Sequence, residues 1–166
     1  MIRVVVCDTG PLIHLSEANA IHLLKQAGGI LIPAAVATEF KRNLPNGKLP
    51  DWIQIHELTA RSSSQVTKWV RNKYVDKGEA EAIGLALQQH GDWLLTDDAE
   101  ARQFAESLGL EVHGSIGLLL WAVASGLVEN REQAHRMLND LKRSSLWISE
   151  RVAAEAANAI DALTSE

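Results

Sequence analysis

The sequence contains a single cysteine and no apolar stretch long enough to cross a membrane. Cys7 cannot form a disulfide within the chain and stands in an apolar run, which indicates a small buried side chain and favours a reducing compartment. A membrane helix needs about 20 apolar residues. The short apolar N-terminal run ends at Asp8, with Arg3 as its one basic flank, so it does not match a signal peptide. We therefore expect a cytoplasmic protein with no membrane segment.

Common cofactor motifs are also absent from the sequence. It has no Gly-x-x-x-x-Gly-Lys-Ser/Thr loop and no Gly-x-Gly-x-x-Gly turn, which argues against nucleotide cofactors. The six histidines show no zinc-site spacing, so we assign them structural or surface roles. A formal net charge of −5 argues against a protein that coats nucleic acid non-specifically. It leaves open an enzyme that gathers acidic residues around a metal ion and keeps its few cations for phosphates.

The length and the apolar runs predict one α/β domain over residues 1–166. A chain of 166 residues with 46% hydrophobic residues can bury a real core. Continuous apolar runs at 4–6, 30–32 and 93–95 are typical of strands buried on both faces, whereas the run at 52–56 has alternating polar residues and indicates an edge strand. A short fifth strand is expected at 111–113. Helices are expected at 12–24, 34–40, 62–74, 77–91, 99–108, 116–124, 131–141 and 149–163, so C-terminal helices run from about residue 130 onward.

Strands that alternate with helices predict a three-layer α/β/α sandwich with a mainly parallel sheet of about five strands. Acidic side chains follow these strands or begin the helices between them. In such sheets ligand chemistry gathers outside the carboxyl ends of the strands. A helix-capping role would explain any one of these acids, but it explains less well why they recur at four places. The acids are Asp8 after the first strand, Glu39 in the helix after the second, Glu79 and Glu81 before the fourth, and Asp97 and Asp98 after the fourth.

Two of these places offer a choice between neighbouring acids. Glu79 lies on the apolar face of its helix, and Glu81 projects about 200° further round, so we favour Glu79 as the inward residue. Adjacent residues that leave a strand point to different sides, so one of Asp97 and Asp98 is expected to cap the next helix through Gln103. We place Asp98 slightly ahead of Asp97 as the ligand.

Converging carboxylates would require a counter-charge. Two carboxylates about 4 Å apart repel by roughly 4 kcal/mol at an effective dielectric constant near 20. A divalent cation removes this repulsion, and oxygen ligands without His or Cys suit Mg²⁺ or Mn²⁺ rather than Zn²⁺. Such a site predicts metal-assisted hydrolysis of a phosphodiester.

Four segments resemble the PIN-domain ribonucleases, and most closely a VapC-like branch with a Gly-Glu-Ala-Glu-Ala-Ile signature. The segments are DTGPLI at 8–13, IPAAV at 32–36 leading to Glu39, GEAEAI at 78–83 and LLTDD at 94–98. The resemblance extends to residues 115–117, and the C-terminal helices match only loosely. It implies a PIN-like three-layer fold, Mg²⁺- or Mn²⁺-dependent RNA cleavage, a homodimer and an antitoxin partner.

The resemblance also implies roles for individual residues. Asp8, Glu39, Glu79 and Asp98 would form the acidic quartet, with Asp97 as a further candidate metal ligand. Many relatives carry aspartate at the third of these positions, where this chain has a glutamate. Thr9 would hold a metal-bound water. The basic residues expected to position the RNA backbone are Lys41, Arg42 and Arg102.

The leading hypothesis is a single-domain, metal-dependent endoribonuclease that acts as the toxin of a toxin–antitoxin pair. The alternative is a PIN-like protein that does not cut and instead binds RNA or an antitoxin. A phosphatase with Asp8 as nucleophile is a third possibility, but dehalogenase-type phosphatases need a second aspartate where this chain has Gly10. The five tryptophans are dispersed, and we assign them to core or subunit-interface packing rather than to base stacking.

Overall fold

The computed structural model describes residues 1–165, and within them five parallel strands form one sheet in the order β3-β2-β1-β4-β5. The predicted α/β fold with a parallel sheet is confirmed. The edge position expected for the strand with alternating polar residues is also confirmed, because this strand is β3. The strands are β1 (Val4–Cys7), β2 (Gly29–Pro33), β3 (Ile53–His56), β4 (Trp93–Leu95) and β5 (Val112–His113).

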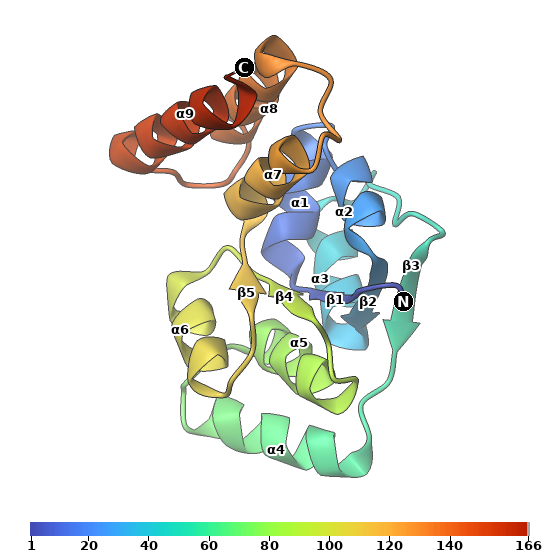
Figure 1. Cartoon of the computed structure of the whole chain (residues 1–166). Helices are drawn as coiled ribbons and strands as arrows, with labels where there is room; N and C mark the ends of the chain where they lie inside the picture. Colours follow the sequence, from blue (N-terminus) through green and yellow to red (C-terminus); the bar gives the residue numbers. More distant parts are fainter. Residues whose placement is uncertain (166) are drawn as a thin grey trace.

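Helices cover both faces of the sheet, as Figure 1 shows. On one face α5 packs against β1, β2 and β4, with α4 outside it, and on the other face lie α1, α2 and α7. The C-terminal helices α8 and α9 pack on α7 and on each other. No helix within residues 1–165 combines the length and hydrophobicity needed to cross a bilayer. The helices are α1 (Thr9–Glu17), α2 (His22–Ala27), α3 (Ala34–Asn43), α4 (Ala60–Arg71), α5 (Lys77–Gln88), α6 (Ala99–Ser107), α7 (Ser115–Ala124), α8 (Arg131–Arg143) and α9 (Glu150–Thr164).

One sequence expectation about the helices is wrong. The apolar pattern over residues 12–24 predicts one helix, but the structure has two, α1 and α2. The break follows the C-cap of α1 at Ala18, because Asn19 takes a left-handed backbone conformation with φ of 54°. Asparagine tolerates this conformation better than most residues and is a common helix terminator.

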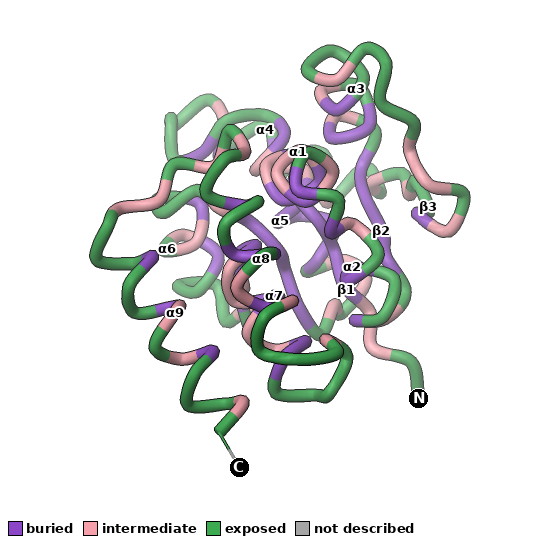
Figure 2. Tube along the Cα trace, turned by 90° about the horizontal axis from the view of Figure 1, so that it is seen from above, coloured by how far each residue is buried: buried purple, intermediate pink, exposed green. Residues whose placement is uncertain are grey.

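The centre of the core is β1, which is buried on both faces. Val5, Val6 and Cys7 have no exposed surface, and the buried part of the chain in Figure 2 runs through β1 and its neighbours. The thiol of Cys7 is free and buried, which agrees with its expected role as a small core side chain.

The strand order places β1 between β2 and β4. The chain therefore continues from β1 to one side of the sheet and later returns to its other side. A crevice forms where the strand order reverses, outside the carboxyl ends of the strands, and it is the usual ligand site of such sheets. The residues that follow β1, β2 and β4 all lie at this edge.

Candidate active site

Asp8 leaves the end of β1 and caps the first turn of α1. Its Oδ1 accepts a hydrogen bond from the backbone N–H of Thr9 at 2.8 Å, and its Oδ2 accepts one from the hydroxyl of Thr96 at 3.0 Å. The Asp8 side chain therefore caps α1 and also lines a cavity at this edge of the sheet. Only 6% of Asp8 is exposed, and this burial raises its pKa to about 6 despite the two hydrogen bonds.

Glu39 reaches the same place from α3. The hydroxyl of Thr9 donates a hydrogen bond of 2.6 Å to Glu39 Oε2, which joins the first turn of α1 to the carboxylate carried by α3. The Glu39 carboxylate lies against Gly78, and a β-carbon at residue 78 would overlap both carboxylate oxygens. The glycine therefore provides the space that this carboxylate fills.

Glu79 and Asp76 form a capping box at the start of α5. Asp76 Oδ1 accepts from the backbone N–H of Glu79 at 2.9 Å, and Glu79 Oε2 accepts from the backbone N–H of Asp76 at 3.1 Å. Burial raises the pKa of Glu79 to about 7, and the nearby negative charges of Asp76, Asp98 and Asp8 add to this effect. Asp76 was not among the expected site residues, although the Asp-x-x-Glu spacing before an apolar run signals such a box.

Glu81 points to a different part of the protein. Its Oε2 accepts a hydrogen bond of 3.0 Å from the backbone N–H of Ala35, in the first turn of α3. Glu79 lines the carboxylate cavity and Glu81 does not. The geometry therefore places Glu79 inward, as its position on the helix face predicts.

Both carboxylate oxygens of Asp97 form hydrogen bonds with other residues of the protein. Its Oδ1 accepts from the backbone N–H of Ser115 at 2.6 Å, and its Oδ2 accepts from the Ser115 hydroxyl at 2.5 Å. The same Oδ2 is hydrogen-bonded to His14 Nδ1 at 2.7 Å. Neither His14 nor Ser115 was among the expected site residues, and nothing in their sequence spacing indicates this contact.

Asp98 caps α6 and is exposed to solvent. Its Oδ1 accepts a hydrogen bond of 2.8 Å from the backbone N–H of Ala101. One of the two adjacent aspartates does cap the helix, but it is Asp98, and the bond goes to Ala101 rather than to Gln103. The hydroxyl of Thr96 accepts from the backbone N–H of Asp98 at 3.3 Å and donates to Asp8, so Thr96 joins the two aspartates.

All of the acidic side chains described above except that of Glu81 line one cavity of about 410 Å³ at the carboxyl edge of the sheet. They follow β1 and β4, lie within α3 or stand at the start of α5, so they are far apart in the sequence. Thr9, His14, Leu146 and Trp147 complete much of the wall. The acidic residues that line the cavity are Asp8, Glu39, Asp76, Glu79, Asp97 and Asp98.

The donor chemistry of this cavity fits a hard divalent cation, because it offers many carboxylate oxygens. Within residues 1–165, however, no three His, Cys, Asp or Glu side chains already stand in a coordinating arrangement. The carboxylates of Glu39 and Glu79 instead accept hydrogen bonds from Thr9 and Asp76.

The expected substrate-binding residues fall into two groups. Lys41 and Arg42 are exposed in the last turn of α3 and do not line the carboxylate cavity. Arg102 lines an adjoining cavity of about 380 Å³, which shares Asp97 and Trp147 with the first. Arg102 therefore lines a cavity that adjoins the carboxylates, whereas Lys41 and Arg42 line neither cavity.

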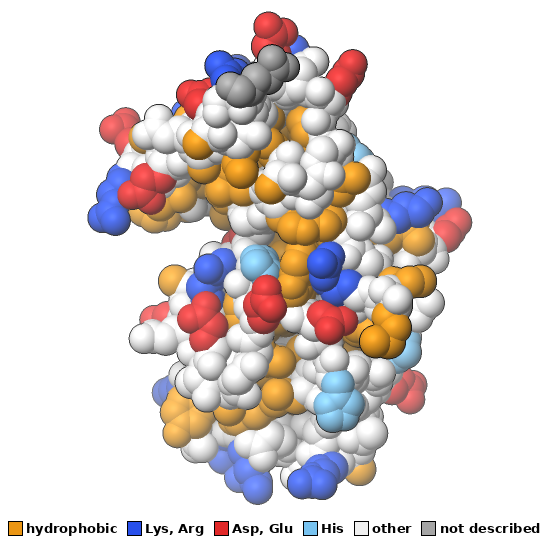
Figure 3. Space-filling model, in the orientation of Figure 1, with side chains coloured by type: hydrophobic (Ala, Val, Ile, Leu, Met, Phe, Trp, Pro, Cys, Tyr) orange, Lys and Arg blue, Asp and Glu red, His pale blue; other side chains and the backbone are white. Residues whose placement is uncertain are grey.

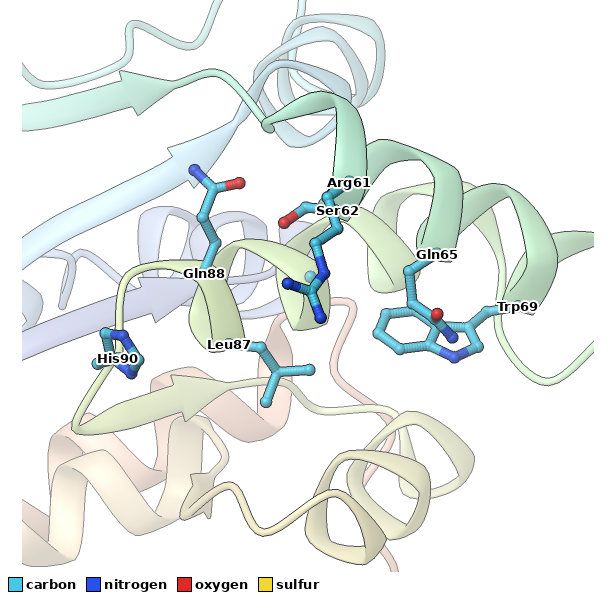
Figure 4. A pocket seen from close by; sticks show the side chains of 8 residues that line it. Arg61, Ser62, Gln65, Trp69, Leu87, Gln88 and His90 are labelled. Carbon is cyan, nitrogen blue, oxygen red and sulfur yellow. The ribbon is translucent and has the colours of Figure 1, made fainter.

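A further cavity of about 500 Å³ lies between α4 and α5 (Figure 4). Trp69 and Leu87 supply its apolar surface, and Arg61 and His90 are its basic side chains. None of the residues described as lining it is an Asp or Glu, and its lining shares no residue with the carboxylate cavity. It therefore lacks the chemistry that the carboxylate cavity offers.

Comparison with known protein families gives a match over most of the chain. Residues 4–162 match the family model described as "DUF3368: PIN domain". A search of curated proteins finds no match. The matched region includes every residue that lines the carboxylate cavity.

Proposed function

The chain belongs to the PIN-domain family, and from this premise we propose that it is a metal-dependent endoribonuclease that hydrolyses RNA phosphodiester bonds. PIN domains are generally nucleases that use divalent metal ions. The observation that carries the proposal is the meeting of Asp8, Glu39, Glu79 and Asp98 in one cavity, although four separate elements supply them. So many carboxylates together are costly unless a cation balances them.

In this proposal the four carboxylates hold Mg²⁺ or Mn²⁺, and Asp76 and Asp97 lie beside them. The bound cation would orient and activate a water and stabilise the leaving oxygen. Thr9 positions the Glu39 carboxylate through its hydroxyl, and in this proposal it would also hold a metal-bound water. Thr96 fixes Asp8 and orients the backbone of Asp98.

The basic residues would bind the substrate backbone. Arg102 is the best placed, since it lies in the cavity next to the carboxylates. Lys41 and Arg42 would contact the RNA further from the cleaved bond, because they are exposed in the last turn of α3 and line neither cavity.

The resemblance to the VapC-like branch extends the proposal to the role of the protein in the cell. We propose that it acts in the cytoplasm as a homodimeric toxin that a cognate antitoxin protein neutralises. An antitoxin that works at this site should close the carboxylate cavity, so the purified pair should not cleave RNA.

The test is cleavage of single-stranded RNA by the purified chain with Mn²⁺, with Mg²⁺ and with a chelator. We expect cleavage with either cation, none with the chelator, and none from Asp8→Asn. Glu81→Gln is the matched control, because it changes an acid outside the cavity. Cleavage that persists in Asp8→Asn would contradict the proposal. RNA binding with neither cleavage nor cation uptake by calorimetry would instead favour a PIN-like binding protein.

A further inference from the structure

Trp147 differs from the tryptophans that belong to the core. Its side chain is 84% exposed, whereas Trp69 and Trp93 are 6% and 7% exposed. It lies in the segment between α8 and α9, at the mouth of the carboxylate cavity. Trp147 is therefore not a core residue, and of the two expected roles only packing at a subunit interface remains open for it. An exposed indole beside a functional cavity calls for an explanation in terms of what it binds.

The segment that carries Trp147 is held at both ends. Both the backbone N–H and the hydroxyl of Ser145 donate to Glu17 Oε1, at 3.0 Å and 2.5 Å, which ties the segment to the end of α1. The Ser149 hydroxyl accepts from the backbone N–H of Val152 at 3.1 Å and caps α9. The indole is thus presented from a fixed backbone while it stays open to solvent.

Trp147 stands between two adjoining cavities. It lines the carboxylate cavity and also the neighbouring cavity of about 380 Å³, which continues past Leu146 to Ile116 and Val152. Figure 3 shows hydrophobic side chains along the hollow between the C-terminal helices and the rest of the protein. The second cavity therefore offers a flat aromatic side chain and an apolar lining next to the carboxylates.

The lining of the second cavity also includes a positively charged side chain, that of Arg102. Within residues 1–165, the guanidinium of Arg102 forms no ion pair with a carboxylate. Gly114 keeps this corner open, because a β-carbon there would lie 3.3 Å from Arg102 Nη2 and 2.7 Å from Asp97 Oδ1. An unpaired guanidinium is suited to a phosphate oxygen.

We propose that Trp147 and Arg102 form a subsite for one nucleotide of the substrate strand, next to the bond that is cut. The unpaired base stacks on the Trp147 indole, and an adjacent phosphate contacts Arg102. Aromatic stacking accepts any base, so the subsite selects single-stranded over paired RNA rather than a sequence. This inference rests on the proposed function, because it takes the substrate to be a nucleic acid.

The test measures binding separately from cleavage. Fluorescence anisotropy records the affinity of a labelled single-stranded oligoribonucleotide for Asp8→Asn, in which cleavage is expected to be absent. Trp147→Ala, Trp147→Phe and the control Leu127→Ala are added to this background. Leu127 is an exposed apolar residue that lines neither cavity. A set of oligonucleotides with one abasic nucleotide, moved along the strand, completes the experiment.

We expect Trp147→Ala to weaken binding about tenfold, Trp147→Phe to retain most of the affinity and Leu127→Ala to have no effect. An abasic nucleotide at one position of the strand should weaken binding by a similar factor, and this loss of affinity should disappear in Trp147→Ala.

The subsite would be contradicted if the abasic nucleotide weakened binding equally in the proteins with and without the Trp147→Ala substitution. Unchanged affinity in Trp147→Ala would also contradict it, as would a change only in oligomeric state by ultracentrifugation, which would assign Trp147 to contact with a second copy. If this pattern appears but the wild-type chain cuts no RNA, the subsite stands and the nuclease proposal fails.

Discussion

The carboxylate of Glu39 occupies the space that a β-carbon on Gly78 would need. Gly78→Ala should therefore displace the carboxylate without unfolding the chain, because the overlap involves only the end of a flexible side chain. We expect the free energy of unfolding to change by less than about 1 kcal/mol and the affinity for Mn²⁺ to fall about 10- to 100-fold. Chemical denaturation and calorimetry measure the two effects.

Gly29→Ala is the control for this substitution. Gly29 begins β2, at the opposite end of the strand from α3, and a β-carbon there would meet nothing closer than 3.9 Å. Unchanged Mn²⁺ affinity in Gly78→Ala would show that Glu39 does not need this space in order to bind the cation.

Asp8→Asn should stabilise the protein in the absence of a divalent cation. Above its raised pKa of about 6, Asp8 is ionised although it is buried, and this costs stability that asparagine would not. Asparagine caps a helix as well as aspartate does. We expect the free energy of unfolding at pH 7.5 with a chelator to rise by about 1–3 kcal/mol, and the stabilisation by Mn²⁺ to disappear. Asp140→Asn changes an exposed aspartate of α8 and should have little effect. A loss of stability in Asp8→Asn would contradict this account.

Cation affinity should increase with pH between about 5.5 and 8. The raised pKa values of Asp8, about 6, and Glu79, about 7, mean that both carboxyls are mostly protonated at pH 5.5 and must lose their protons to bind a cation. The two pKa values together imply an affinity for Mn²⁺ roughly 100-fold weaker at pH 5.5 than at pH 8. Calorimetry in buffers of different ionisation enthalpy would count the released protons.

Stability without the cation should depend on pH in the opposite direction. The folded chain keeps protons on Asp8 and Glu79 at pH values at which the unfolded chain has lost them. The free energy of unfolding should therefore fall as the pH rises from about 4 to about 7. Melting temperatures with a chelator and with saturating Mn²⁺ would test this, and parallel pH curves for the two conditions would be the contrary result.

Glu79→Gln and Glu81→Gln should separate activity from stability. Glutamine can keep the capping bond of Glu79 but removes its charge from the cavity, so cleavage and Mn²⁺ affinity should fall by at least about tenfold. Glu81→Gln weakens the hydrogen bond to Ala35 at the start of α3 and should cost about 1 kcal/mol of stability while cleavage continues. The opposite pattern would assign the catalytic role to Glu81.

Much of the fold could be predicted from the sequence, because it depends on local patterns. Continuous apolar runs identified β1, β2 and β4 as interior strands, and alternating polar residues placed β3 at an edge. The single helix expected over 12–24 was wrong because the conformation of Asn19 outweighed the apolar spacing.

The candidate site was less predictable, because its details depend on contacts between distant segments. Helix geometry indicated that Glu79 and Glu81 point to different places, and in the structure only Glu79 lines the cavity. The hydrogen bonds of Asp97 to Ser115 and His14, in contrast, join distant segments and leave no local signal in the sequence. Trp147 could not be distinguished from the buried tryptophans by spacing, because its exposure depends on how the segment between α8 and α9 packs.

Asp8, Glu79 with Asp76, and Asp98 all stand at the N-termini of helices, of α1, α5 and α6. Each of these helix ends carries about half a positive charge, so three helix dipoles point into a cavity lined with acids. The same positive ends that offset the repulsion among the carboxylates would also attract the phosphates of an incoming strand. Although the protein is acidic overall, these helix ends provide a local positive potential that favours the binding of a polyanion.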